Sequence, residues 1–459
     1  ISSSLFCTLL YTQTIYLSTL PKPLEISHTI VARFHLATSM LDTTLAKIRQ
    51  YIPVKMFSKI QPVYHWTLSF LAAVWYQFPS RKIKVIAVTG TKGKSSTVEI
   101  LNAILEEAGY KTALSNTIRF KVGDISSENL YKMSMPGRFF VQKLIRKAVN
   151  SNCQYIILEM TSQGALLYRH RFIDLDAFIF TNLSPEHIEA HGSYEKYIES
   201  KVSIVRRMEK SKKKDKAIIT NANDKESYRF NECKVDRKIS YGINDVEPYE
   251  IKKDGLIFTF SGQLVNSHLS GLFNLYNILA AITCARSQNI SDDSIIRAIE
   301  KFDGIPGRVQ KIVAGQDFTV IVDYAHTPDS LEKLYQIFQS SRNICVLGGT
   351  GGGRDTWKRA VMGKIADNYC DEIILTDEDP YDEDPQKIIA DVAKGVTSQL
   401  PHIILDRREA IREAIKHAKT GDTVLITGKG TDPYIMGPKG TKTLWNDARV
   451  AKEELEKII

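Results

Sequence analysis

Short apolar runs recur along the chain from residue 84 onward, and amphipathic stretches separate them. After a β-branched run at residues 85–88, further runs lie at 155–160, 177–183 and 217–223. Each has the length of a buried strand, and the stretches between them place apolar residues at helical spacing. Strands that alternate with helices predict an α/β fold with a parallel sheet.

The same alternation returns in the last third of the chain. Apolar runs lie at residues 318–325, 343–349, 372–377 and 423–428, with helical patterns at 330–339 and 408–418. Short alternating strands near residues 254–260 and a helix over 275–287 precede this second series. Pro306-Gly307 is a strong turn signal, and we expect it to mark the hinge between two α/β units.

The first 83 residues belong to neither series. Residues 1–20 are moderately apolar, but no Lys or Arg precedes the apolar part, so the pattern of a signal peptide is incomplete. The apolar stretch at 66–78 is shorter than the about 20 residues that a membrane-spanning helix needs. We expect a buried or interfacial helix there and no stable insertion into a membrane.

Composition excludes some functional classes. The net charge of +9 over 459 residues is mild, and the basic residues form no long stripe with interleaved aromatics, so we expect no nucleic-acid partner. The six cysteines are scattered without a C-x-x-C pair. This spacing predicts neither a disulfide framework nor a zinc site, and it favours the reducing cytoplasm.

The most informative segment covers residues 84–96 and reads KVIAVTGTKGKSS. A strand, a glycine turn and a helix start form a cradle for phosphate, because backbone N–H groups and the positive helix end face the anion. The spacing Gly90-x-x-Gly93-Lys94-Ser95 is two residues shorter than the usual P-loop, and a glycine turn before an ordinary helix is the alternative. We predict a nucleoside-triphosphate site made by Gly90, Thr91, Lys92, Gly93, Lys94, Ser95 and Ser96.

Polar residues follow the next strands. Glu159 ends an apolar run, where ligands of open α/β sheets gather, and a carboxylate there commonly holds Mg²⁺. His187 and His191 are four residues apart, but their H-x-E-x-H order is not the H-E-x-x-H of zinc proteases. Assistance to Mg²⁺ is therefore the better interpretation of His187, whereas Lys201, taken alone, is an ordinary surface lysine.

Further candidates lie beyond residue 270. Asn274 and Asn277, one turn apart at a helix start, either read an adenine edge or cap the helix. Asp323 ends the first strand of the second series. Arg354 follows a second glycine-rich turn that lacks the Lys-Ser pair, and its guanidinium suits a carboxylate or phosphate.

Taken together, these residues resemble the Mur ligase family, and most closely the members that add the third amino acid to UDP-N-acetylmuramoyl-dipeptide. The resemblance covers about four-fifths of the chain, from about residue 84 to about residue 447. The strings that carry it, in family order, are TGTKGKSS, FTNLSPEHIEAHGSYEKYIESK, NANDK, GLFNLYNILAA, GIPGRVQ, VDYAHTPDSL, GGGRDTWKRAVMG, EDPYDEDP, DRREAI and ITGKGTD. It implies a divergent N-terminal segment (1–83), a central P-loop-type, parallel-sheet ATP-binding domain (84–308) and a C-terminal Rossmann-like α/β domain that binds the amino acid (309–459).

The resemblance also implies a reaction. ATP would phosphorylate an acceptor carboxylate, and the amine of an amino acid would displace phosphate from the acyl phosphate to form an amide. Lys94 would neutralise the β- and γ-phosphates, while Ser95, Glu159 and His187 arrange Mg²⁺. Lys201 would be carbamoylated and serve as a ligand of a second metal ion.

Nucleotide and acceptor sites are implied in the same way. Asn274 and Asn277 would contact the adenine, and Arg308 and Asp323 would lie with the nucleotide at the domain junction. His326 would shape the same cleft. The implied partners are ATP, an amino acid and a UDP-muramoyl-peptide, for a cytoplasmic, monomeric enzyme of peptidoglycan precursor synthesis.

Departures from the family pattern bear on the amino acid. The family's Asp-Asn-Pro-Arg, which selects meso-diaminopimelate, reads EDPY at residues 378–381, so the second carboxylate of diaminopimelate loses its Arg partner. The family's Gly-Lys-Gly-His-Glu reads GKGTD at 428–432. Acidic residues around position 379 favour lysine, or another cationic amino acid, over diaminopimelate. The expected amino-acid site comprises Arg354, Asp379, Pro380, Tyr381, Gly428 and Asp432.

Two alternatives stay open. A folylpolyglutamate synthase or another amide ligase shares the reaction and the fold, although the YAHTP and EDP strings are more Mur-like. A non-catalytic nucleotide-binding partner is the alternative from a different class, and intact Lys94, Glu159, His187 and Lys201 disfavour it. The family's usual UDP-binding domain is not recognisable in residues 1–83, so the acceptor is either held differently or of another kind.

Overall fold

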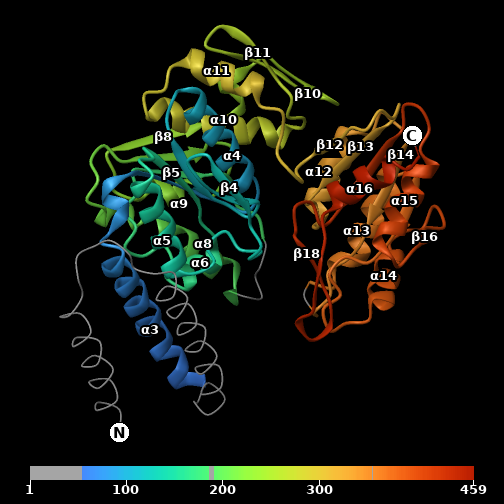
Figure 1. Ribbon diagram of the computed structural model, residues 1–459, viewed down its shortest axis with the longest axis horizontal. Helices are drawn as coiled ribbons and strands as arrows, with labels where there is room; N and C mark the ends of the chain where they lie inside the picture. Colours follow the sequence, from blue (N-terminus) through green and yellow to red (C-terminus); the bar gives the residue numbers. More distant parts are fainter. Residues whose placement is uncertain (1–53, 186–190, 354, 459) are drawn as a thin grey trace. The chain divides into compact units, whose positions relative to one another are not determined.

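The computed structural model describes residues 54–185, 191–353 and 355–458 (Figure 1). The chain divides into two compact units, residues 1–64 and 65–459. Helix α3 (Val54–Trp75) crosses that division, and the 3-10 turn η1 (Pro79–Lys82) follows it. The expected helix at 66–78 therefore ends at Trp75, with the indole ring of Trp66 packed edge-on against Phe172. None of the helices in the described residues combines the length and the apolar character that a membrane-spanning segment needs.

An eight-stranded sheet forms the central domain, in the order β4-β3-β2-β5-β1-β6-β7-β8. The strands are β1 (Lys84–Thr89), β2 (Thr112–Ser115), β3 (Arg119–Val122), β4 (Ile125–Glu128), β5 (Tyr155–Glu159), β6 (Ala177–Phe180), β7 (Ala217–Asn221) and β8 (Arg237–Tyr241). Six of them run parallel, and β3 and β4 add an antiparallel edge. The predicted parallel sheet is confirmed. β1 lies between β5 and β6, so the loops after these three strands meet at one edge of the sheet.

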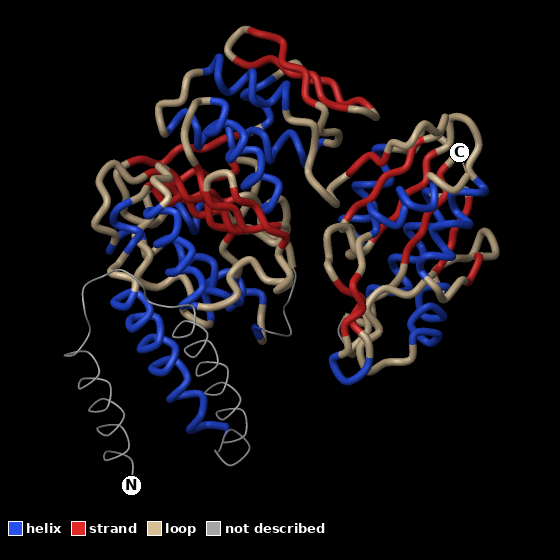
Figure 2. The backbone as a smooth tube through the Cα atoms, viewed as in Figure 1, coloured by secondary structure: helices blue, strands red, loops and turns tan. Residues whose placement is uncertain are grey.

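Helices cover both faces of this sheet (Figure 2). They are α4 (Lys94–Glu107), α5 (Arg138–Asn150), α6 (Ser162–Leu166), α8 (Tyr194–Val205), η2 (Met208–Lys210), α9 (Ser227–Asn231), η3 (Ile243–Val246), α10 (Leu272–Ser287) and α11 (Asp292–Lys301). Successive residues of β1 serve opposite cores: Ile86 and Val88 join one, whereas Val85 and Ala87 join the other. This alternation is the period of two that a strand imposes, and burial on both sides explains the uniformly apolar sequence.

A small antiparallel sheet, β11-β10-β9, lies between the two α/β series in the sequence. Its strands are β9 (Tyr249–Lys252), β10 (Gly255–Phe260) and β11 (Gln263–Ser267), as expected from the alternating pattern near residue 254. The turn at Pro306-Gly307 follows α11 and is closed by a bridge between Ile305 and Arg308.

The C-terminal domain is a second α/β sheet, in the order β12-β13-β17-β14-β15-β16, and is parallel except for β12. Its elements are β12 (Gln310–Ile312), β13 (Thr319–Asp323), α12 (Pro328–Ile337), β14 (Asn343–Leu347), α13 (Lys358–Tyr369), β15 (Glu372–Leu375), α14 (Pro385–Ala393), β16 (His402–Ile403), α15 (Arg407–His417), β17 (Thr423–Thr427) and α16 (Asp447–Leu455). A two-stranded ribbon, β18 (Tyr434–Met436) with β19 (Lys442–Leu444), and the turn η4 (Pro438–Gly440) precede α16. The expected second α/β unit is thus confirmed.

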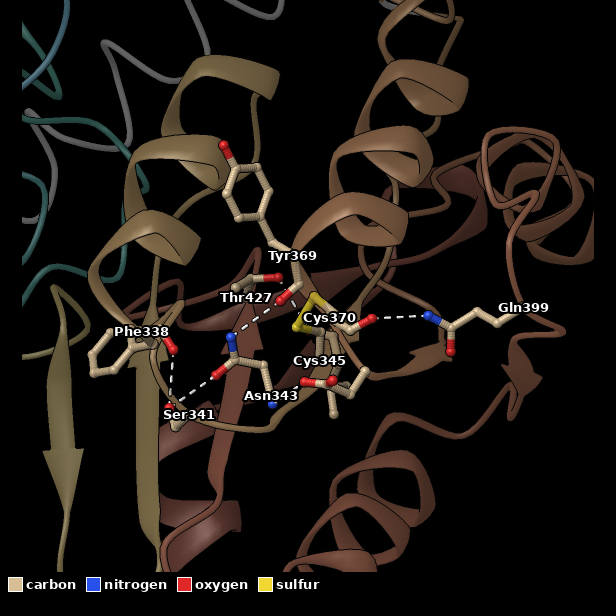
Figure 3. Close-up of a disulfide and its surroundings, with 10 residues drawn as sticks. Phe338, Ser341, Asn343, Cys345, Tyr369, Cys370, Gln399 and Thr427 are labelled. Atoms are coloured by element: carbon tan, nitrogen blue, oxygen red, sulfur yellow. Dashed lines mark hydrogen bonds between the residues drawn. A yellow bond between two sulfur atoms is a disulfide. The ribbon is translucent and has the colours of Figure 1, made fainter.

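One expectation about the cysteines is wrong. Cys345 in β14 and Cys370, which follows α13, form a disulfide with a Cα–Cα distance of 6.0 Å (Figure 3). They meet because α13 carries the chain back to start β15 beside β14, a crossover that cysteine spacing alone does not reveal. Cys153, Cys233 and Cys284 are free and buried, as expected for small core residues.

Candidate active site

The strand, turn and helix predicted at residues 84–96 are present. β1 ends at Thr89, and α4 begins at Lys94, directly after Gly93 with a φ of +80°. A Cβ atom at position 93 would lie 2.1 Å from Oδ1 of Asn277, so both the left-handed backbone and the approach of α10 require glycine here. Gly93 has no side chain to cap α4, which leaves the N–H groups of the first turn for an anion.

Residues that follow β6 hold this phosphate loop in place. Asn182 accepts hydrogen bonds from the loop N–H groups, through its carbonyl from Thr91 (2.8 Å) and through Oδ1 from Lys92 (2.9 Å). The hydroxyl of Thr181 donates to the carbonyl of Lys92 at 2.7 Å. Sequence reasoning did not select Thr181 or Asn182, although their position directly after a strand that borders β1 was the available signal.

A hydroxyl and a carboxylate meet at the start of α4. Ser95 Oγ donates to Glu159 Oε2 at 2.7 Å, and the hydroxyl of Thr117 lies 2.7 Å from Ser95 Oγ. Glu159 is buried at the end of β5, and within the described ranges no basic side chain forms an ion pair with it. A buried carboxylate costs free energy unless a cation or hydrogen bonds offset it, and carboxylate and hydroxyl oxygens are the donors that Mg²⁺ prefers. The residues present therefore fit a Mg²⁺ ion. His187 lies outside the described residues.

The burial of Lys201 differs most from what its own sequence segment predicts. Its side chain in α8 is only 2% exposed, so the interpretation as a surface lysine is wrong. Its Nζ donates to the carbonyl of Gly90 at 2.6 Å and lies 4.8 Å from the ring centre of Tyr197. The Tyr197 hydroxyl in turn lies 2.8 Å from the hydroxyl of Thr91. Helix α8 thus presents a buried ammonium group to the phosphate loop.

His191 contacts the same region from the segment that precedes α8. Its Nε2 lies 3.1 Å from Ser162 Oγ, and its ring packs edge-on against Tyr197. These contacts assign it a structural part in supporting the helix that carries Lys201.

The two predicted amides of α10 contact each other. Asn277 lies against Gly93 and donates to Asn274 Oδ1 at 3.2 Å. Asn274 donates to the carbonyl of Ser270 at 2.8 Å. An N-cap side chain accepts hydrogen bonds from N–H groups of the first helical turn. Both amides instead donate, to a backbone carbonyl and to an amide oxygen, so neither acts as the helix cap that was one of the two interpretations of the sequence.

Asp323 and Arg308 lie together where β13 ends. Asp323 accepts hydrogen bonds from the backbone N–H groups of Ala325 (2.6 Å) and Val309 (2.7 Å). Burial raises the pKa of the Asp323 carboxyl, and the positive charge of Arg308 opposes that rise. The Arg308 guanidinium stacks 4.5 Å above the ring of Tyr324, and its buried Nε has no hydrogen-bond partner among the described residues. An unused, buried donor of this kind is suited to an anionic or carbonyl ligand.

Two of the predicted amino-acid residues, Asp379 and Asp432, form an ion-pair cluster with two lysines. The fully buried Lys429 donates to Asp379 (2.8 Å) and to Asp432 (2.9 Å). Lys132 makes a second pair of contacts with the same carboxylates, at 3.1 Å and 2.7 Å. Sequence reasoning missed both lysines, although Lys429 lies inside the GKGTD string. Arg354 lies outside the described residues.

Glu378 is buried next to this cluster. Its Oε1 accepts a hydrogen bond from Thr350 at 2.9 Å, whereas its buried Oε2 has no partner in the described part of the chain. Burial raises the pKa of the Glu378 carboxyl, and Lys429 opposes the rise.

One cavity of 790 Å³ collects most of the predicted residues. Those that line it are Gly90, Thr91, Lys92, Gly93, Lys94, Ser95, Ser96, Glu159, Lys201, Asn277, Arg308, Asp323, His326, Asp379, Tyr381, Gly428 and Asp432. Asn274 and Pro380 do not line this cavity. Phosphate-binding, acidic and basic groups therefore share one space large enough for several small substrates.

Comparisons with known proteins identify the family of both α/β units. The Mur ligase middle domain matches residues 88–285, and the Mur ligase glutamate ligase domain matches residues 307–430. A UDP-N-acetylmuramoyl-L-alanyl-D-glutamate–2,6-diaminopimelate ligase of Syntrophomonas wolfei is 39% identical over 84% of this chain and 81% of its own length. A UDP-N-acetylmuramyl-tripeptide synthetase of a Roseiflexus species is 33% identical over 85% and 82%. A solved structure of a UDP-N-acetylmuramoyl-L-alanyl-D-glutamate–2,6-diaminopimelate ligase has a TM-score of 0.58 at 26% identity, over 82% of this chain and 79% of its own.

Proposed function

Because this chain belongs to the Mur ligase family, we propose that it adds an amino acid to the carboxylate of a UDP-N-acetylmuramoyl-peptide, in the synthesis of peptidoglycan precursors. It is an ATP-dependent ligase that forms a carbon–nitrogen bond between an acid and an amino acid. The observation that carries the proposal is the group of Ser95, Glu159 and buried Lys201 around a phosphate loop.

The proposed reaction has two steps. An oxygen of the acceptor carboxylate attacks the γ-phosphorus of ATP, which gives an acyl phosphate and ADP. The amine of the amino acid then attacks the acyl carbon, loses a proton and expels phosphate, which leaves an amide. Loop N–H groups and Lys94 would stabilise the charge on the transferring phosphoryl group, and Arg308 and Asp323 would position the nucleotide.

The residues that would hold Mg²⁺ are Ser95 and Glu159, with His187 as a further candidate. The bound ion would neutralise phosphate charge. For Lys201 we propose carbamoylation, which turns an ammonium group into a carboxylate-like metal ligand. Its burial beside the phosphate loop supports this proposal, because a carbamate there is shielded from bulk water.

The amino acid that we propose is lysine. Asp379 and Asp432 bind the ammonium group of Lys132 in addition to that of Lys429, so the pair can hold a second cationic side chain, and the ammonium group of a lysine substrate would take the place of Lys132. Position 381 is Tyr, so this turn offers no guanidinium for the second carboxylate of diaminopimelate. Diaminopimelate, which the name of the Syntrophomonas wolfei relative specifies for that protein, is the competing substrate. We further propose a monomer that works in the cytoplasm, where ATP is supplied.

Phosphate release with ATP, UDP-muramoyl-dipeptide and a panel of amino acids tests the activity. Turnover with lysine is expected, and turnover with diaminopimelate alone would refute the proposed amino acid while leaving the ligase intact. Lys201→Ala should lose turnover and recover part of it with added short carboxylic acids, since these replace the missing carbamate. Lys196→Ala, an exposed lysine on the same helix, is the matched control and should keep full activity. Full activity of Lys201→Ala would contradict the assigned role.

A further inference from the structure

Two histidines and one glutamate meet on the C-terminal domain, apart from the residues that line the cavity. Glu372 begins β15, His402 begins β16 and His417 ends α15. One ring nitrogen of each histidine and one carboxylate oxygen of Glu372 all lie within 4.8 Å of one another. We propose that these three side chains bind a divalent transition-metal ion of the zinc class.

The spacing suits tetrahedral ligation. His402 Nε2 lies 3.6 Å from Glu372 Oε1, and two ligands of a zinc ion with bonds near 2.0–2.1 Å are separated by about 3.4 Å. His417 Nδ1 hydrogen-bonds to the same oxygen, so the ion would take the place of that shared proton. Both imidazoles are partly exposed, which gives an ion access and leaves a coordination position for water.

Neighbouring charged groups orient the ligands. Arg342 Nη2 donates to the other carboxylate oxygen of Glu372 at 2.8 Å, which turns Oε1 toward the histidines. Glu413 Oε2 lies 3.7 Å from His417 Nε2, one turn away on α15. A metal-bound histidine characteristically donates its second N–H to a carboxylate, and Glu413 is placed for that contact.

The donor set decides the class of metal. Two imidazoles and one carboxylate suit Zn²⁺, Ni²⁺ and Cu²⁺, whereas Mg²⁺ and Ca²⁺ prefer oxygen donors only. Bound there, the ion would link β15, the two-residue edge strand β16 and the end of α15, and so would fix this edge of the sheet.

Equilibrium dialysis of the full chain with Zn²⁺ tests the site, with an excess of Mg²⁺ present to occupy oxygen-rich sites. We expect His402→Ala and His417→Ala to bind one equivalent of Zn²⁺ less than the unchanged protein, and Glu413→Gln to bind this equivalent about 10-fold more weakly. His268→Ala removes an exposed histidine elsewhere and should leave the stoichiometry unchanged.

A second readout separates ligation from misfolding. Zn²⁺ should raise the midpoint of thermal unfolding of the unchanged protein, and this rise should shrink in both histidine variants, while their midpoints without zinc stay within a few degrees. Equal zinc stoichiometry in the unchanged protein and in both histidine variants, His402→Ala and His417→Ala, would overturn the proposal and leave Glu372, His402 and His417 as a hydrogen-bonded surface network. Ligase activity is not the readout, so loss of the zinc site and failure of the proposed function are distinguishable.

Discussion

Replacing Gly93 by alanine tests the claim that the phosphate loop depends on a close approach of α10. Two separate costs follow from the structure. The φ of +80° at position 93 is a left-handed conformation that costs a residue with a Cβ about 1–2 kcal/mol. The new Cβ would also lie 2.1 Å from Asn277 Oδ1, which forces this amide to move and to lose its 3.2 Å hydrogen bond to Asn274, worth about 1 kcal/mol.

The two costs add to about 2–3 kcal/mol, which corresponds to about 30- to 150-fold weaker ATP binding if ATP binds the loop in its present conformation. Isothermal titration calorimetry with a non-hydrolysable ATP analogue measures this ratio directly. In an Asn277→Ala background the contact is absent, so Gly93→Ala should weaken binding only by the backbone part, about 5- to 30-fold.

Gly109→Ala is the matched control, because Gly109 has a φ of +86° but a Cβ there meets nothing within 4 Å. It should lower the free energy of unfolding by about 1–2 kcal/mol and leave ATP affinity unchanged. The reasoning is refuted if Gly93→Ala binds the analogue as tightly as the unchanged protein, or if Asn277→Ala does not reduce the effect.

Two further predictions concern buried charge. His170 is fully buried, and desolvation, together with repulsion from Arg171 and Arg207, lowers the pKa of its imidazole to about 3. Between pH 6.5 and pH 3 the imidazole is therefore neutral in the folded protein, whereas it is protonated in the unfolded chain, where its pKa is near 6.5. The free energy of unfolding is therefore at its full value above pH 6.5 and decreases as the pH falls. Urea titrations should show that the free energy of unfolding of the unchanged protein falls by about 2 kcal/mol more than that of His170→Leu between pH 7 and pH 5. A difference between the two proteins that does not change with pH would refute this prediction. Asp447 pairs with Arg407 through hydrogen bonds of 2.7 and 2.8 Å with both side chains almost fully buried, so Asp447→Ala should cost about 3–5 kcal/mol of unfolding free energy, against less than about 1 kcal/mol for Glu456→Ala in an exposed pair.

Local patterns were sufficient to predict the central strands of the two large sheets, although not their edge strands. The apolar run at 155–160 forms β5 (Tyr155–Glu159), and the helical pattern at 408–418 forms α15 (Arg407–His417). Both were predictable because a strand buried on two faces and an amphipathic helix each leave a pattern in consecutive residues. Gly93 and Ser95 were predicted for the same reason, since a strand, a turn and a helix start are local.

Contacts between segments that are far apart in the chain could not be predicted from the sequence pattern. Lys201 looks like a surface residue in its own helix and becomes buried only because α8 packs beside the loop after β1. The pairing of Lys429 with Asp379 and the disulfide between Cys345 and Cys370 also depend on how separate crossovers meet, which spacing along the chain does not encode.

Transfer of oxygen from acceptor to phosphate tests the central claim most directly. UDP-muramoyl-dipeptide labelled with ¹⁸O in its terminal carboxylate is incubated with ATP, Mg²⁺ and the amino acid, and the released phosphate is analysed by mass spectrometry. Because an acceptor oxygen attacks the γ-phosphorus and leaves with it when the amide forms, each phosphate should carry one ¹⁸O atom. Phosphate without ¹⁸O, released at the rate of ADP formation, would show that water attacks ATP and would contradict an acyl-phosphate ligase.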